Sequence, residues 1–175
     1  MAPIRFASVA IDWDNDGSFA TANDEIVNYV KAISVVQGIQ APLQRVADIG
    51  TLTITVDNQT RRFSPAYTSG ALYGKLLPYR AVRVQVTDGS TTWTVFRGVT
   101  RAIRPMSGQY GMREATIECA DLLAVLQDFN ISIPLQQDVS PSYLLKMITS
   151  TAFRTAKASG NFIFTGNPEV TDTVT

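Results

Sequence analysis

The side chains best suited to chemistry are three aspartates near the N-terminus, in the stretch IDWDNDGSF. Asp12, Asp14 and Asp16 are each separated by one residue, and Gly17 follows the last of them. Calcium-binding loops present carboxylates to the ion with this spacing, at loop positions 1, 3 and 5, and place a glycine at the sharp turn of position 6. The spacing therefore makes residues 12–25 a candidate calcium loop.

The rest of this loop fits a calcium site less well. Ser18 would supply the backbone carbonyl of position 7, and Asn23 stands at position 12, where a bidentate glutamate usually tightens the site. Both flanks have strand-like patterns, which excludes an EF-hand. The alternative is a solvated turn in which Asp and Asn side chains accept hydrogen bonds from backbone N–H groups. Both interpretations stay open. The stretch is either such a turn or a calcium site whose ligands are Asp12, Asp14, Asp16, Ser18 and Asn23.

The composition argues against an enzyme. The 175 residues include no histidine, which removes the usual base of serine and cysteine hydrolases and the commonest zinc ligand. The single cysteine, Cys119, lies in an apolar run and is predicted to be a core residue. Asp12 and Asp14 lie two residues apart in a turn, without the second acidic cluster that a glycosidase pair needs.

The charge balance gives no reason to expect a nucleic acid or membrane partner. Lysine plus arginine equals aspartate plus glutamate at 15 each, so the net charge is zero. No uninterrupted apolar run approaches the roughly 20 residues that cross a bilayer, so we predict no membrane span. The pair Arg61 and Arg62, in RRFSP, has no surrounding basic patch. We predict that these two arginines make polar or ion-pair contacts at a surface or interface.

Hydrophobic periodicity predicts a mainly β protein. Runs of alternating apolar and polar residues, separated by hairpin-type turns, indicate an antiparallel β-barrel or sandwich. After these runs, apolar residues have helical spacing in one or two short segments. We predict a barrel domain over residues 1–130, and a helix with an extended tail over 131–175 that resembles the start of an incomplete second domain. The predicted strands are 4–12, 25–38, 51–57, 81–88, 91–103 and 112–120, and the predicted helices are 120–129 and 140–153.

Two details of the predicted strands bear on the surface. Regular alternation in the first strand would place Ile4, Phe6, Ser8 and Ala10 on one face, with Val9 and Ile11 on the other. Gly98 in the fifth strand indicates a bulge or a close approach of two backbones.

The loop over residues 66–79 is rich in glycine and aromatic side chains. Tyr73, Leu76, Leu77 and Tyr79 lie just before a strand. Such residues either cover one end of a barrel or form a protein–protein contact, and the sequence favours neither.

Several segments resemble, in this order, the N-terminal part of the tail-tip or baseplate hub proteins of long-tailed bacteriophages. These hubs are related to the hub proteins of contractile tails, and the resemblance covers roughly residues 8–155. The segments are IDWDNDGSF, GTLTITVDNQTRRFSP, LYGKLLPYRAVRVQV, TVFRGVTRAIRP and ATIECADLLAVLQDFNISIPL.

The resemblance implies a ring of copies built from tail-tube-like barrels, which joins the tail tube to distal fibre, spike or tip proteins. A trimeric ring is favoured, and a hexameric ring is the alternative. We expect Tyr73, Leu76, Leu77 and Tyr79 to pack between subunits, with Arg61 and Arg62 in polar contacts.

The chain departs from these proteins in two ways. Hub proteins usually extend well beyond 175 residues, and the turn that often holds Pro-Gly in them has Tyr79 in place of the glycine.

The expected function is therefore structural and non-enzymatic, in the tail tip of a virion assembled in the bacterial cytoplasm. The alternative is a calcium-dependent β-sandwich module of the tail tip that binds carbohydrate or a receptor. In that case the 12–25 loop would hold the metal, and aromatic side chains would line an open groove.

Overall fold

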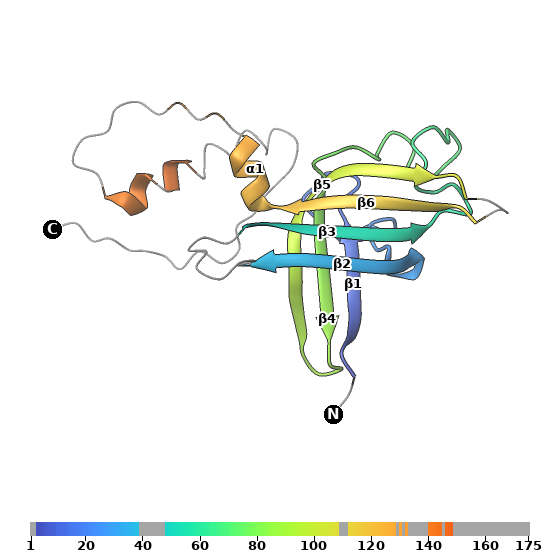
Figure 1. The fold of residues 1–175 in the computed structure, drawn as a ribbon, viewed down its shortest axis with the longest axis horizontal. Helices are drawn as coiled ribbons and strands as arrows, with labels where there is room; N and C mark the ends of the chain where they lie inside the picture. The colour runs from blue at the N-terminus through green and yellow to red at the C-terminus, as the bar shows by residue number, and fades with distance from the viewer. Residues whose placement is uncertain are drawn as a thin grey trace.

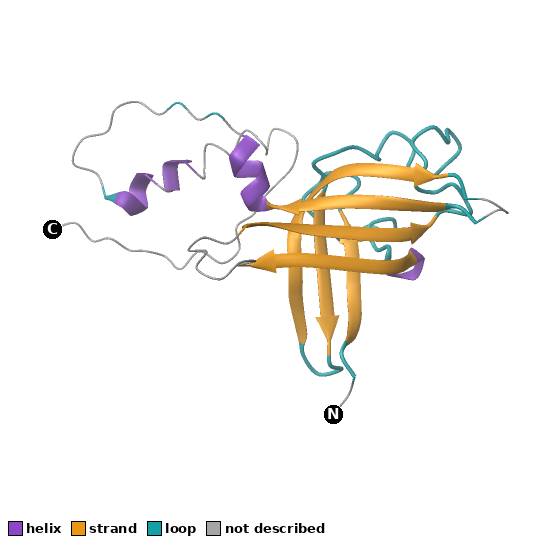
Figure 2. Ribbon diagram, in the orientation of Figure 1, coloured by secondary structure: helices purple, strands orange, loops and turns teal. Residues whose placement is uncertain are grey.

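The computed structural model describes residues 3–38, 48–108, 112–128, 130, 132, 140–144 and 146–148. In these residues the chain forms one antiparallel six-stranded sheet, curled into a half-barrel, and two short helices (Figures 1 and 2). The predicted fold class, mainly β and antiparallel with one or two short helices, is confirmed.

The strands follow the order β1-β4-β5-β6-β3-β2, so β1 and β2 are the two edges of the sheet. The elements are β1 (Arg5–Ile11), the 3-10 turn η1 (Val27–Tyr29), β2 (Val30–Gly38), β3 (Asp48–Asp57), β4 (Ala81–Thr87), β5 (Thr92–Met106), β6 (Glu114–Asp121) and α1 (Leu122–Asp128).

The curl of the sheet depends on β5, which has 15 residues and pairs with two strands in succession. Its first half pairs with β4 as far as Val99, and its second half pairs with β6 from Gly98 onward. As a result β1 and β4 run crosswise to β2, β3 and β6 (Figure 1). Gly98 lies at the crossing, where an added Cβ would be 2.1 Å from the carbonyl oxygen of Ala120, so the predicted close approach is confirmed.

The core fills the concave side of this sheet. Alternate residues of the strands provide most of it, and Trp13, Phe63 and Phe96 are its largest fully buried side chains. Phe63 belongs to the long loop between β3 and β4, so this loop covers one end of the half-barrel with its own apolar side chains. Cys119 is a core residue as predicted, and burial raises the pKa of its thiol to about 12. At neutral pH the thiol is therefore protonated and a poor nucleophile.

Two predicted boundaries were wrong. The segment 25–38 is not one strand, because Glu25 makes only an isolated bridge to Ala10 and residues 27–29 form a 3-10 turn before β2 begins at Val30. Residues 48–50, predicted as loop, belong to β3. In both places the strand boundary depends on backbone pairing with another segment, Asp48 with Gly38 and Glu25 with Ala10, which local periodicity does not report.

The first helix begins at Leu122, two residues later than predicted, because β6 extends to Asp121, and the second follows Ser140 as predicted. Asp121 caps α1, since its Oδ1 accepts the N–H groups of Leu123 at 2.9 Å and Ala124 at 3.2 Å. Ser140 caps the second helix by accepting the N–H of Tyr143 at 3.3 Å, and the part of this helix past residue 148 lies outside the described residues. Over the described ranges, we find no helix long and apolar enough to cross a membrane.

Candidate functional site

The acidic loop folds around the carboxylate of Asp12, which is almost fully buried. Its two oxygens accept the backbone N–H groups of Asp16 at 3.2 Å and Gly17 at 2.9 Å. Burial raises the pKa of Asp12 above its ordinary value, and these hydrogen bonds act in the opposite direction. Asp12 thus holds the turn closed from the inside, a role that turn chemistry predicts for aspartate.

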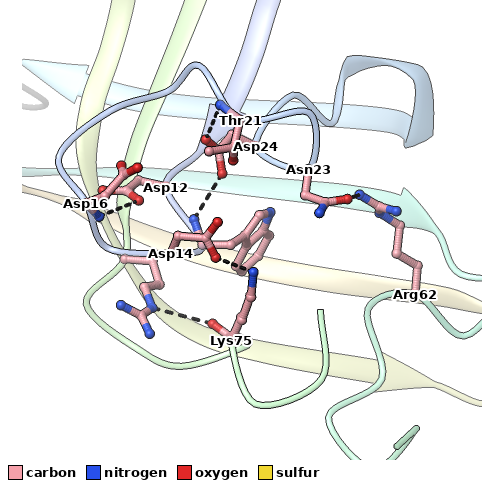
Figure 3. A network of polar contacts seen from close by, with 10 residues as sticks. Asp12, Asp14, Asp16, Thr21, Asn23, Asp24, Arg62 and Lys75 are labelled. Atoms are coloured by element: carbon pink, nitrogen blue, oxygen red, sulfur yellow. Dashed lines mark hydrogen bonds and ion pairs between the residues drawn. The ribbon is translucent and has the colours of Figure 1, made fainter. Parts of the chain in front are cut away.

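Of the other two aspartates of the motif, Asp14 points away from Asp12 and Asp16 lies beside it (Figure 3). Asp14 forms an ion pair with Lys75, which comes from the loop before β4. Asp16 accepts the N–H of Ser18 at 2.8 Å, and the hydroxyl of Ser18 accepts the N–H of Ala20 at 3.2 Å. Each carboxylate therefore already has a positively charged or N–H partner from the chain.

Asn23, the last predicted calcium ligand, lies on the other side of the loop from Asp12 and Asp16 (Figure 3). Its Oδ1 accepts a hydrogen bond from Arg62 at 2.8 Å. Within the described part of the chain, no group of three or more acidic, histidine or cysteine side chains is placed to hold a metal ion. The calcium site stays a prediction, and in this conformation its five ligands do not converge.

A second buried carboxylate, that of Asp24, completes the loop, a role that the sequence did not predict for this residue. Its two oxygens accept the N–H groups of Trp13 at 3.3 Å and Thr21 at 3.1 Å. The backbone of the same residue accepts the N–H of Ile11 at 2.9 Å. The C-terminal end of the loop is therefore tied back to Ile11 of β1 and to Trp13, and the signal that could have found Asp24 is an aspartate two residues before the apolar Ile26.

The arginine pair contacts aromatic side chains of its own chain. The guanidinium of Arg62 lies 5.1 Å from the ring centroid of Tyr29, and that of Arg61 lies 5.9 Å from the ring of Tyr67. Cation–π contacts of this kind stabilise a loop at its surface. Together with the bond to Asn23, they show that Arg62 links the 58–80 loop to the acidic loop. The interface role predicted for both arginines stays a prediction.

The four predicted packing residues of the 66–79 loop divide into two groups. Leu76 belongs to the core cluster and is 8% exposed, so its own chain covers it. Tyr73, Leu77 and Tyr79 are about half exposed. One of the four residues therefore lies in the core and three lie on the surface, and the protein–protein contact predicted for those three stays a prediction.

The backbone of Tyr79 is in the left-handed region, with φ of 61°. Its N–H donates to the carbonyl of Thr100 at 2.7 Å. Its ring lies under the Arg101 guanidinium at 5.6 Å, and its hydroxyl contacts Asp128 of α1 at 3.4 Å. Tyr79 therefore connects the loop, β5 and α1.

Several exposed apolar side chains lie on an arm, which we define as residues 4–8 and 85–95 of β1, β4, β5 and their turns. The arm extends past β2, toward the N-terminus in Figure 1. A β-bulge interrupts β1 between Phe6 and Ser8. Because of this extra residue, Phe6 pairs with Val86 and faces the core side with Val9, instead of the side of Ser8. The predicted faces of the first strand were therefore wrong at Phe6.

A second bulge, between β4 and β5, has the same effect on Trp93. Val84 pairs with Phe96 but the next residue of β4, Gln85, pairs with Thr94, so Val95 is the extra residue. Trp93 consequently pairs with Val86 and lies on the core side, like Phe96. Bulges commonly redirect side chains in this way near functional sites.

Together the bulges create an aromatic row, which we define as Phe6, Val86 and Trp93, across three neighbouring strands. The row continues the apolar face of the core, yet Phe6 is 47% and Trp93 46% exposed. Ile4, just before β1, is more exposed still. Covering the row requires apolar groups from another molecule or from residues outside those described.

Comparison with known proteins adds no identification, since no family model matches the chain and no curated protein matches it either.

Proposed function

We propose that the chain is a structural subunit of the tail tip or baseplate of a long-tailed bacteriophage. In this role copies form a ring, trimeric or alternatively hexameric, that joins the tail tube to distal tip or fibre proteins. The proposal includes no enzymatic activity and places the protein in the virion after assembly in the host cytoplasm.

The observation that carries the proposal is the aromatic row of the arm. Two independent bulges direct Phe6 and Trp93 to the apolar face, although that face has no cover at this point. Two exposed aromatic rings do not stabilise a monomer, whereas a subunit of an assembly buries such rings against a neighbour. The open half-barrel and the ordered resemblance to tail hub proteins support the same function.

Purified tails of a phage that carries this gene provide the test. We expect electron microscopy to show several copies around the tail axis at the distal end, with the row buried at a contact. Phe6→Ser with Trp93→Ser should abolish tail assembly while the isolated protein keeps its thermal midpoint. Thr92→Ser, on the same arm but outside the row, is the matched control. Absence of the chain from purified tails would refute the proposal.

The same row supports a second candidate, a tail-tip module that binds carbohydrate or a receptor. Two exposed aromatic rings that flank Val86 on one face of a sheet form a surface on which apolar faces of a ligand can pack. Titration with host surface glycans, with and without calcium, separates the two functions. Binding that Trp93→Ala abolishes, in a protein absent from the tail axis, would favour the module.

A further inference from the structure

The outer edge of β2 has the properties of a strand that accepts another strand. β2 is the last strand of the sheet, and along the described residues only β3 pairs with it. Seven of its nine residues are exposed on both faces of the sheet. An edge of this kind presents a row of backbone N–H and C=O groups that another chain can pair with.

None of the usual features that block edge pairing occurs in the centre of β2. Lys31 is the only charged residue of the strand, and its ammonium is 3.0 Å from the carboxylate of Glu114. Proline is absent from the strand, and the bulges lie at its two ends, between Val30 and Ala32 and between Val36 and Gly38. A regular five-residue stretch, Ala32–Val36, is left between them.

The opposite edge of the sheet, β1, is protected by its own chain. Ala10 and Glu25 form an antiparallel bridge, and the N–H of Ile26 donates to the carbonyl of Val9 at 2.8 Å. The carboxylate of Glu25 also accepts the N–H of Val9 at 2.9 Å. Because the C-terminal half of β1 is covered in this way, it cannot receive β2 of another copy along its length.

The sequence of the regular stretch is nearly symmetric about Ser34. If two antiparallel copies of β2 are related by a two-fold axis at Ser34, Ile33 lies opposite Val35 and Ala32 lies opposite Val36. Ser34 then lies opposite Ser34 of the second copy. Aliphatic side chains face aliphatic side chains, the polar residue faces itself, and no like charges meet, so the pairing is complementary in both apolar character and charge.

We propose that two copies of the chain pair through β2, as neighbouring antiparallel strands around a two-fold axis at Ser34. The two six-stranded sheets then become one continuous sheet. The interaction uses the same strand of both copies, so it cannot by itself build a ring. It is a separate contact that goes beyond the proposed function and does not depend on it.

Variants with opposite charges at Ser34 test this register. Only in a pair with a two-fold axis at residue 34 does this residue lie opposite residue 34 of the second copy. Sedimentation of the full chain should show a concentration-dependent dimer for the wild type. Ser34→Lys alone and Ser34→Glu alone should each weaken dimerisation about ten-fold or more, since like charges then lie opposite each other. An equimolar mixture of the two variants should restore the dimer.

Thr92→Lys and Thr92→Glu are the matched controls, at an exposed strand position on the arm, and should dimerise like the wild type. Hydrogen exchange of the wild type gives a second readout that needs no variant. Amides of residues 32–36 should become more protected as the concentration rises, and those of β4 should not.

Three results would overturn the proposal. They are a wild type that stays monomeric at high concentration, a Ser34→Lys variant that dimerises as well as the wild type, or protection of residues 32–36 that is independent of concentration. The last result would show that another part of the same chain covers β2. Absence of the protein from phage tails would refute the proposed function but would leave this dimer unaffected.

Discussion

At the scale of single residues, Tyr79 shows how a strained backbone is kept in place. A left-handed conformation costs a residue with a Cβ about 1–2 kcal/mol, which is why glycine is common in such turns. Here the cost is offset by the hydrogen bond to Thr100, the cation–π contact with Arg101 and the contact with Asp128. The departure from the Pro-Gly pattern therefore replaces a flexible turn with one that is tied to β5 and α1.

The backbone strain at Tyr79 predicts that a glycine variant is more stable than an alanine variant at this position. Tyr79→Ala loses the ring contacts and keeps the backbone strain, whereas Tyr79→Gly loses the same contacts and relieves the strain. We expect the glycine variant to be more stable than the alanine variant by about 1 kcal/mol in urea unfolding. The reverse order would mean that φ of residue 79 is not positive in solution. At Ala32, where the chain is extended, the change to glycine should destabilise, which provides the control.

The acidic loop leads to a prediction about calcium. Its carboxylates are already occupied by backbone N–H groups and by Lys75, so we expect the fold not to need the ion. Asp12→Ala leaves two N–H groups without an acceptor and should lower the free energy of unfolding by roughly 1–2 kcal/mol. The loss should be equal in calcium and in chelator, as measured by thermal unfolding in both.

The calcium interpretation predicts a different pattern. In that case calcium raises the thermal midpoint of the wild type, and Asp14→Asn or Asp16→Asn removes the increase. Lys75→Met is a useful companion variant, because it frees Asp14 without changing any carboxylate. A calcium response that appears only in Lys75→Met would show that the ammonium competes with the metal for this site.

The spacing of the aspartates was enough to predict a turn stabilised by side chains, but not the direction of each carboxylate. Lys75 and Arg62 decide where Asp14 and Asn23 point, and both belong to a loop some forty to sixty residues further along the chain. A motif read along the sequence does not contain that information.

At the scale of elements, α1 is attached to the sheet by few contacts. Val125 packs with Val99 in a small apolar cluster separate from the main core, and Arg101 forms an ion pair with Asp128 at the other end of the helix. The hydrogen bond from Arg101 lowers the pKa of Asp128 below its ordinary value. A weakly attached helix of this kind opens locally before the sheet does.

The pKa shift gives the direction of a pH effect. Because the folded-state pKa of Asp128 is lowered, its contribution to stability is present above the ordinary pKa of 3.8 and is lost as the pH falls through the lower folded value. We expect hydrogen exchange in α1 to accelerate on acidification below about pH 4 and in high salt, while β6 stays protected. The pair is exposed, so the effect should be small.

Asp128→Asn is the control for this prediction. The variant should show fast exchange in α1 at neutral pH and low salt, with little further change on acidification. If the wild type and the variant respond to acid and salt alike, another group controls the docking of the helix.

The alternation of apolar and polar residues was enough to predict the strands, but it did not predict which side chains of the arm lie on the core side of the sheet. A regular strand would place Phe6 with Ser8, and a single extra residue in β1 moves it to the side of Val9. Nothing in the local sequence marks this bulge, because Ala7 is compatible with a regular strand. The bulge is determined by pairing with β4, a strand more than seventy residues away in the sequence.

At the scale of the whole molecule, the sequence predicted the fold class and the number of strands, and the order of the strands came from the structure. The order β1-β4-β5-β6-β3-β2 leaves two edges of different character, one covered in part by residues 24–26 and one that pairs only with β3 among the described residues. It also leaves the aromatic row exposed at the end of the arm. These two surfaces suit a subunit that meets more than one neighbour, which accords with the proposed role in a tail.

Gly98 has a mechanical consequence for such a subunit. The far end of the arm, at the start of β5, lies about six residues from this glycine, roughly 20 Å at the rise of a β-strand. By simple leverage, a tilt of about 10° at the crossing displaces the tip by about 3.5 Å. That distance is comparable to an atomic contact, so a side chain at residue 98, which would force the crossing strands apart at Ala120, should also move Phe6 and Trp93 relative to the rest of the sheet.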